Sequence, residues 1–156
     1  MPKSKKTLVV CLLFPLIAGG ISGFLTRNGM ETFAYLNKPP LSPPGIVFPI
    51  VWTVLYLMMG LASWLVLTSG ERPEQIRQAL FFYVVQLIVN VLWPVFFFSL
   101  GWYLFSFFWL LLLFVLILVV IWLFSDLSQT AAWLMVPYLI WTVFAGYLNL
   151  GVYLLN

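Results

Sequence analysis

Large aromatic side chains and a few amides recur at helical spacing in three separate stretches of this chain of 156 residues. Phe48, Trp52 and Tyr56 are each four residues apart, so in a helix they share one face. The other two sets are Gln86, Asn90, Trp93 and Phe97, at spacings of 4, 3 and 4, and Tyr138, Trp141 and Ala145, at 3 and 4. Indole and phenol rings around a few amides are typical of an apolar ligand pocket with a small number of orienting groups.

The same sequence lacks the parts that most acid–base, nucleophilic and metal chemistry requires. It has no histidine, its one cysteine is Cys11, and none of its four acidic residues lies in a long apolar stretch. Ser-His-Asp arrangements and zinc sites therefore lack ligands or bases, and a proton-driven pump would lack its intramembrane carboxylate or histidine. We expect no metal site, and the residues favour a binding protein over an enzyme without deciding between the two.

Composition places the aromatic faces inside a membrane. With 64% hydrophobic and 7% charged residues, the chain has too little polar surface to coat a soluble domain. About 20 uncharged residues cross a hydrocarbon core of ~30 Å as a helix, so the longest uncharged stretch, Gln78 to Ser125, must fold back, and Ser99-Leu100-Gly101 is the expected bend. The sequence predicts an all-α fold, an integral membrane bundle of five transmembrane helices in a single domain, 1–156. The predicted spans are about 7–26, 45–68, 77–99, 102–124 and 130–154, with a proline-rich loop at 27–44.

The distribution of basic residues predicts the orientation of this bundle in the lipid bilayer. With five spans, one side holds five basic residues and the other side two: Lys3, Lys5, Lys6, Arg72 and Arg77, against Arg27 and Lys38. Because Lys and Arg are enriched on the cytoplasmic side, we expect a cytoplasmic amino terminus and an external carboxyl terminus. Topology then accounts for the net charge of +3, and no nucleic-acid partner is expected.

Two segments each allow two interpretations. The basic start followed by Leu8 to Ala18 fits a first span and also a cleaved signal peptide, although the apolar stretch continues to Leu25, as a span requires. The prolines of the loop either stiffen a lid over a pocket or only end one helix and restart the next: Pro39, Pro40, Pro43 and Pro44.

Polar and small residues within the spans carry a similar ambiguity. Gln86 and Asn90 should face the bundle interior, because polar side chains at mid-membrane are costly without partners. Asn90 then either lines a ligand pocket or hydrogen-bonds a neighbouring helix, and the residues alone leave both open. Gly19 and Gly23 form a small-xxx-small pair, which we expect to pack helices closely within one chain.

Four motifs resemble one family of membrane proteins. They are "PLIAGGISG", "KPPLSPPG" leading into "VWTVLY", "NVLWPVFFF" and "SQTAAWLMVPYLIWTVFAGYLN". Together they are similar to the tryptophan-rich sensory protein and translocator protein family (TspO/MBR, peripheral-type benzodiazepine receptor-like), and they touch four of the five predicted helices.

The resemblance implies a homodimer of five-helix bundles in a bacterial cell membrane, with protoporphyrin or a related tetrapyrrole bound beneath the first loop. Some bacterial members look like light-dependent degraders of protoporphyrin, which would make Trp52 and Trp141 the catalytic, photochemical residues. With the aromatic faces above, the expected ligand-binding set is Phe48, Trp52, Tyr56, Asn90, Trp93, Tyr138, Trp141 and Ala145. No cofactor is obligatory, because a metal-free macrocycle needs no axial ligand and can stack on indole faces.

The chain also departs from the family pattern. Leu41 stands where many relatives carry tryptophan, and Trp109 where many seem to carry an acid. No basic residue follows Arg77, so the carboxyl-terminal sterol motif lacks its Lys or Arg. Three functions stay open: a tetrapyrrole-binding sensor or regulator, an enzyme promoting light-dependent porphyrin degradation, and a passive carrier of porphyrins, sterols or similar hydrophobic molecules.

Overall fold

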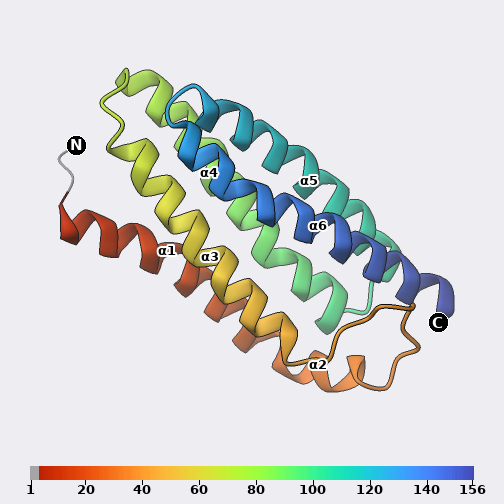
Figure 1. Cartoon of the computed structure of the whole chain (residues 1–156). Coiled ribbons are helices and arrows are strands. Elements are labelled where there is room, and N and C mark those ends of the chain that lie inside the picture. Colours follow the sequence, from red (N-terminus) through yellow and green to blue (C-terminus); the bar gives the residue numbers. More distant parts are fainter. Residues whose placement is uncertain (1–3) are drawn as a thin grey trace.

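The computed structural model describes residues 4–156 and shows a bundle of long, roughly parallel and antiparallel helices (Figure 1). The five long helices are α1 (Lys5–Leu25), α3 (Val47–Leu67), α4 (Pro73–Pro94), α5 (Tyr103–Ser125) and α6 (Gln129–Leu155). A π-helical turn, η1 (Val95–Ser99), continues α4, and a short helix, α2 (Arg27–Phe33), follows α1. Each of the five, with η1 joined to α4, is long and apolar enough to cross a membrane, which confirms the all-α bundle of five spans.

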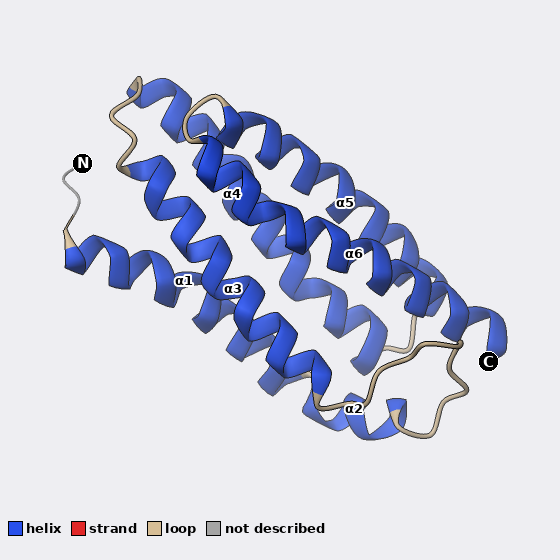
Figure 2. Ribbon diagram, viewed as in Figure 1, coloured by secondary structure: helices blue, strands red, loops and turns tan. Residues whose placement is uncertain are grey.

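The segment 27–44 differs from the predicted proline-rich loop in its first part. Residues Arg27–Phe33 form α2, so the connection without regular structure is shorter and runs to α3 (Figure 2). Helical hydrogen bonds pass across the junction, from the amide of Thr26 to the Ser22 carbonyl and from the amide of Met30 to the Thr26 carbonyl. The third span also begins earlier than predicted, at Pro73, because proline is well tolerated in the first turn of a helix.

The helices pack through regularly spaced buried residues. In α5 the buried positions alternate at spacings of 4 and 3: Ser106, Leu110, Leu113, Ile117, Val120 and Phe124. In α6 the same alternation continues through Ala131, Met135, Tyr138, Thr142, Ala145, Asn149 and Val152. A repeat of 3.5 residues on both partners is typical of long helices that pack at a shallow angle, and it produces the extensive α5–α6 contact.

Local signals set several helix ends. The Ser128 hydroxyl accepts a hydrogen bond from the Ala131 backbone amide at 3.2 Å and caps α6. Gly101 adopts φ +67° in the turn between η1 and α5, which a side chain would disfavour. The long uncharged stretch therefore reverses at the predicted bend.

Helix α1 packs mainly against α3 and buries the smallest share of its residues among the five long helices. The backbones of the two helices approach closely at Gly60 of α3, where an added Cβ would collide with the backbone of Cys11 and Leu12. At the other end of α1, near Gly20 and Gly23, an added Cβ would meet nothing within 4 Å. The two backbones thus approach closely near Cys11, whereas at the other end open space lies beside Gly20 and Gly23 and only Gly19 packs on the Tyr56 ring.

The proline segment, residues 34–46 between α2 and α3, lies on the carboxyl-terminal end of α6. The backbone N–H of Asn37 donates to Asn156 Oδ1 at 3.1 Å, and Asn156 Nδ2 donates to the backbone carbonyl of Asn37 at 2.8 Å. Pro39 packs directly on Gly151, and the Tyr147 hydroxyl donates to the Pro40 carbonyl at 2.6 Å. These contacts make the segment a strap along α6, and they do not by themselves support either a lid or a purely helix-ending role of the prolines, the two interpretations left open by the sequence.

Candidate functional site

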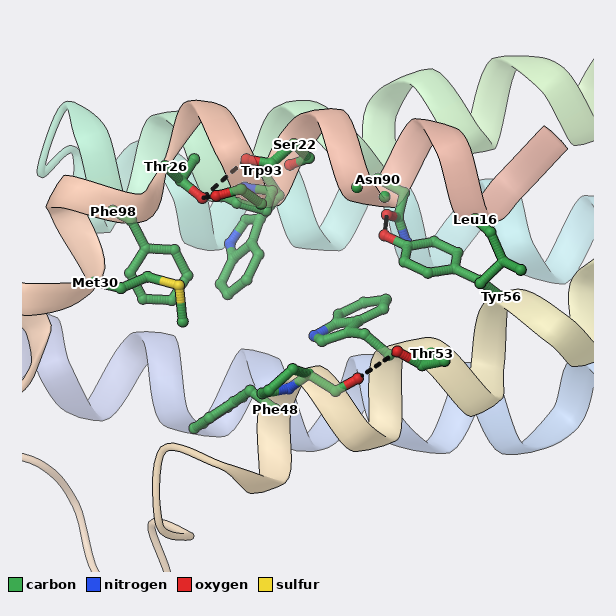
Figure 3. Close-up of a pocket in the computed structure, with 16 residues that line it drawn as sticks. Leu16, Ser22, Thr26, Met30, Phe48, Thr53, Tyr56, Asn90, Trp93 and Phe98 are labelled. Carbon is green, nitrogen blue, oxygen red and sulfur yellow. Dashed lines mark hydrogen bonds between the residues drawn. The ribbon is translucent and has the colours of Figure 1, made fainter. Parts of the chain in front are cut away.

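A cavity of about 310 Å³ lies between α1, α3 and α4, with α2 and η1 at its outer end. Figure 3 shows Thr26, Met30 and Phe98 around that end and Leu16 near Tyr56 at the other. Four of the residues that line the cavity carry hydroxyls (Ser22, Thr26, Thr53 and Tyr56), one carries an amide (Asn90), and none is charged. The cavity is therefore an uncharged, mostly apolar space within the membrane-spanning part of the bundle, with five aromatic residues in its walls.

Helix α3 supplies the aromatic wall that its spacing predicted. Phe48, Trp52 and Tyr56 line the cavity together, with Pro49 and Thr53 between them on the same side of the helix. The rings of Trp52 and Tyr56 lie 5.6 Å apart between centroids and tilt by 30°. The indole N–H of Trp52 has no hydrogen-bond partner within residues 4–156. Trp52 thus presents both an aromatic face and a free donor.

Helix α4 and η1 form the second wall, through Asn90, Trp93, Pro94 and Phe98. The Trp93 indole is fixed from behind, because its Nε1 donates to Asn149 Oδ1 at 2.9 Å. Its ring also stacks on the buried Phe97 at 5.1 Å between centroids. Of the predicted α4 face, Asn90 and Trp93 reach the cavity, whereas Gln86 and Phe97 are buried in the helix packing.

Asn90 holds three helices together while it lines the cavity. The Tyr56 hydroxyl donates to Asn90 Oδ1 at 2.7 Å, and Asn90 Nδ2 donates to the Tyr138 hydroxyl at 2.7 Å. The Tyr138 hydroxyl in turn donates to Gln86 Oε1 at 2.8 Å. Buried polar groups in a bundle are stable only with such partners. The helix-linking interpretation of Asn90 is therefore correct, and its place on the cavity wall is compatible with ligand contact as well.

The third wall is the part of the site that aromatic spacing did not predict. Helix α1 contributes Gly19, Gly20 and Gly23, together with Leu16, Ser22 and Thr26. Ser22 is tied to α4, since its hydroxyl donates to the Val91 carbonyl at 2.8 Å. The signal was present in "AGGISG", where glycines repeat at helical spacing, but it was interpreted only as helix packing. The glycines leave this wall without bulky side chains, and open space lies beside Gly20 and Gly23.

Three residues of the predicted binding set do not line the cavity. Tyr138 and Ala145 belong to the buried seam of α6, and Tyr138 reaches the site only through Asn90 and an edge contact with Trp52, 6.2 Å between ring centroids. Trp141 lies behind Phe48, with ring centroids 6.0 Å apart, and its buried indole N–H has no partner within the described residues. These residues support the cavity wall from behind.

The cavity opens sideways between α1 and α3. Of the residues that line it, Gly20 and Gly23 on α1 and Pro49 and Thr53 on α3 are exposed, whereas Tyr56, Asn90 and Trp93 are buried. Because both helices span the membrane, this opening faces the lipid. A hydrophobic molecule dissolved in the bilayer can therefore reach the aromatic walls without crossing the proline segment.

The residue types at the site favour binding. No group of three metal-ligating side chains occurs within residues 4–156, and the residues that line the cavity include no Asp, Glu, Lys or Arg. Trp109, which stands at the position of an expected acid, donates its indole N–H to the Val89 carbonyl at 2.7 Å and links α5 to α4. What remains is flat aromatic surface, one free indole N–H and an amide.

The fold and this cavity define the class: an integral membrane protein of five helices with an internal aromatic pocket open to lipid. A sequence model of the TspO/MBR family matches residues 11–154, and the chain belongs to that family. The tryptophan-rich protein TspO of Chlorobaculum tepidum is 34% identical and covers 100% of this chain and 99% of its own. The tryptophan-rich sensory protein of Cereibacter sphaeroides is 37% identical, over 81% and 77% of the two chains. The translocator protein of Bos taurus is 34% identical, over 88% and 82%.

Proposed function

We propose that this protein binds a tetrapyrrole such as protoporphyrin and acts as a membrane sensor or regulator of it. The observation that carries the proposal is the cavity lined by glycines of α1 and by the indoles of Trp52 and Trp93. A planar, metal-free macrocycle needs flat aromatic partners and no axial ligand. Membership of a family that includes tryptophan-rich sensory proteins adds support.

The size of the cavity bears on how such a ligand would sit. Ligand pockets commonly measure ~300–1,000 Å³, so a cavity of about 310 Å³ lies at the small end. A macrocycle would place its body between the two walls and leave one edge in the opening between α1 and α3. Stacking contributes ~0.5–1.5 kcal/mol for each aromatic contact beyond area burial. Two indole contacts together with desolvation are compatible with a dissociation constant in the micromolar range, equivalent to ~8 kcal/mol.

Titration of the purified protein with protoporphyrin in darkness tests the proposal. We expect saturable quenching of tryptophan fluorescence at micromolar concentrations, and a dissociation constant raised about three- to tenfold in Trp52→Ala, the loss of one stacking contact. Trp133→Ala is the matched control, because Trp133 is exposed on the outer face of α6 and lies outside the cavity. Quenching that does not saturate, or that weakens equally in both variants, would reject binding in this cavity.

Light-dependent degradation of the porphyrin is a second candidate, and the position of Trp52 favours it. An excited porphyrin can take an electron from a neighbouring indole, and Trp52 lines the cavity whereas Trp141 is separated from it by Phe48. Trp52→Phe should therefore slow the light-driven loss of porphyrin absorbance more than Trp141→Phe. Equal rates in wild type and in both variants would remove the tryptophans from the reaction. A passive carrier would instead transfer porphyrin between vesicles without any change in its spectrum.

A further inference from the structure

The side-chain hydroxyl and amide groups that line the cavity already form hydrogen bonds within the protein. The hydroxyls of Ser22, Thr26 and Thr53 donate to backbone carbonyls at 2.8, 2.9 and 2.7 Å. Asn90 is saturated on its inner side by Tyr56 and Tyr138. Burial of a carboxylate without a charged or hydrogen-bonding partner is very costly. A ligand with acidic substituents must therefore keep them outside the walls, where the macrocycle edge leaves the cavity.

Arg27 is the cation placed at that edge. It directly follows Thr26, which lines the cavity, and it lies 4 and 7 residues beyond Gly23 and Gly20 on the exposed rim. Helical hydrogen bonds continue across Thr26, so the three positions lie on the same side of the chain. Arg27 also stands at the end of α1, where a spanning helix reaches the membrane surface.

The guanidinium of Arg27 has no acidic partner among the described residues. Its Nη1 donates a hydrogen bond to the Phe24 carbonyl at 3.0 Å, and its Cζ lies 4.0 Å from the centroid of the Phe24 ring. A guanidinium carries five N–H donors in a planar fork that matches a carboxylate. Most of the guanidinium N–H groups of Arg27 therefore have no hydrogen-bond acceptor among the described residues, and the residue is exposed.

Lys38 is the other cation on this side of the bundle among the described residues, and its ammonium group already has partners within the protein. Lys38 Nζ donates to the carbonyls of Ala34 and Leu36 at 3.2 and 3.4 Å and lies 4.9 Å from the centroid of the Phe33 ring. It stabilises the end of α2 and the start of the proline segment. Lys38 therefore serves as a matched control for Arg27, with equal charge and a position in the same connection between α1 and α3.

We propose that Arg27 determines ligand specificity by pairing with a carboxylate on the edge of the flat molecule held in the cavity. The ligand class is a planar apolar ring system with acidic substituents along one edge. Its body lies between α1 and α3 within the bilayer, and its carboxylates lie at the membrane surface. This inference rests on the proposed function, and it adds the orientation of the ligand and the residue that recognises its charge.

The experiment compares protoporphyrin, which has two carboxylates, with its uncharged dimethyl ester. Full-length protein is placed in nanodiscs of phosphatidylcholine, and tryptophan quenching is measured in darkness at low ionic strength. We expect Arg27→Gln to weaken binding of the acid about three- to tenfold and to leave binding of the ester unchanged. Arg27→Lys should fall between wild type and Arg27→Gln, because it keeps the charge and loses the planar fork. Lys38→Gln should leave both affinities unchanged.

Each alternative result has a distinct meaning. If Arg27→Gln changes the affinities for acid and ester equally, or changes neither, Arg27 does not recognise the carboxylate and the inference is wrong. An equal effect on both ligands would indicate that Arg27 binds a lipid phosphate or stabilises the folded protein. If neither ligand quenches the wild-type protein, the proposed function fails first. Added salt should reduce the preference for the acid over the ester in wild type, and a preference that salt leaves unchanged would also contradict the charge pairing.

Discussion

At the residue scale, three glycines of α1 have two different roles. Gly19 faces the Tyr56 ring so closely that any Cβ would overlap it. Gly20 and Gly23 face open space along the cavity, with nothing within 4 Å of an added Cβ. The predicted small-xxx-small pair is therefore correct for Gly19, which packs against α3, and wrong for Gly23, which contacts no neighbouring helix at that position. The absence of side chains at Gly20 and Gly23 thus leaves open space beside this wall of the cavity.

This difference predicts opposite results for two adjacent substitutions. Gly19→Ala should displace Tyr56, disturb its hydrogen bond to Asn90 and destabilise the protein by ~1–3 kcal/mol, the usual cost of overpacking. Gly20→Ala should be neutral or slightly stabilising, because alanine favours helix over glycine and meets no atom. Thermal unfolding in detergent measures both. Equal melting temperatures for the two variants would contradict the packing of Tyr56 on Gly19.

Residue spacing predicted much of the cavity and missed its third wall. Phe48, Trp52, Tyr56, Asn90 and Trp93 line it because large groups four or three residues apart share a helix face. The same rule placed Tyr138, Trp141 and Ala145 on one face but could not tell that this face meets other helices. Periodicity shows which residues point together, and only packing shows what they meet.

At the element scale, composition and periodicity predicted the helices well and the connections poorly. Five spans follow from the length of the apolar stretches, and the bend at Gly101 follows from glycine at a tight turn. Helix α2 was missed because its sequence, "RNGMETF", carries polar residues and a glycine that resemble a loop. It is supported by tertiary contact, since Gly29 packs against the backbone of Phe98 in η1.

The proline strap predicts a further measurable effect. Gly151→Ala would place a Cβ on Pro39 and should displace the strap from α6, with a cost of ~1–3 kcal/mol partly offset by better helix propensity. We expect faster proteolysis within residues 34–46. Gly45→Ala is the control, because nothing lies within 4 Å of its added Cβ. If cleavage rates are the same in wild type and Gly151→Ala, the contact does not hold the strap.

At the scale of the whole molecule, five spans place the two ends of the described chain at opposite ends of the bundle, as Figure 1 shows. Of the basic residues in the described part, Lys5, Lys6, Arg72 and Arg77 lie toward one end and Arg27 and Lys38 toward the other. Lys3, which enters the same prediction, lies outside the described residues. A homodimer also stays a prediction, drawn from the family resemblance.

Orientation can be tested directly. Because basic residues concentrate on the cytoplasmic side, the carboxyl terminus should be external and the amino terminus cytoplasmic. A reporter enzyme that is active only outside the cytoplasm should be active when fused after Asn156 and inactive when fused to the loop near Glu71. The reverse pattern would invert the orientation and place Arg27 at the cytoplasmic surface.

The uneven attachment of α1 has a mechanical consequence. Gly60 fixes this helix against α3 near Cys11, while its other half borders the cavity, so a small change in the tilt of α1 alters the width of the slot. Spanning helices adjust their tilt to the thickness of the bilayer. We therefore expect the affinity for protoporphyrin to vary with acyl-chain length in nanodiscs of otherwise equal composition, whereas a rigid slot would give one value in all of them. The surrounding lipid would then act as a regulator of the site without occupying it.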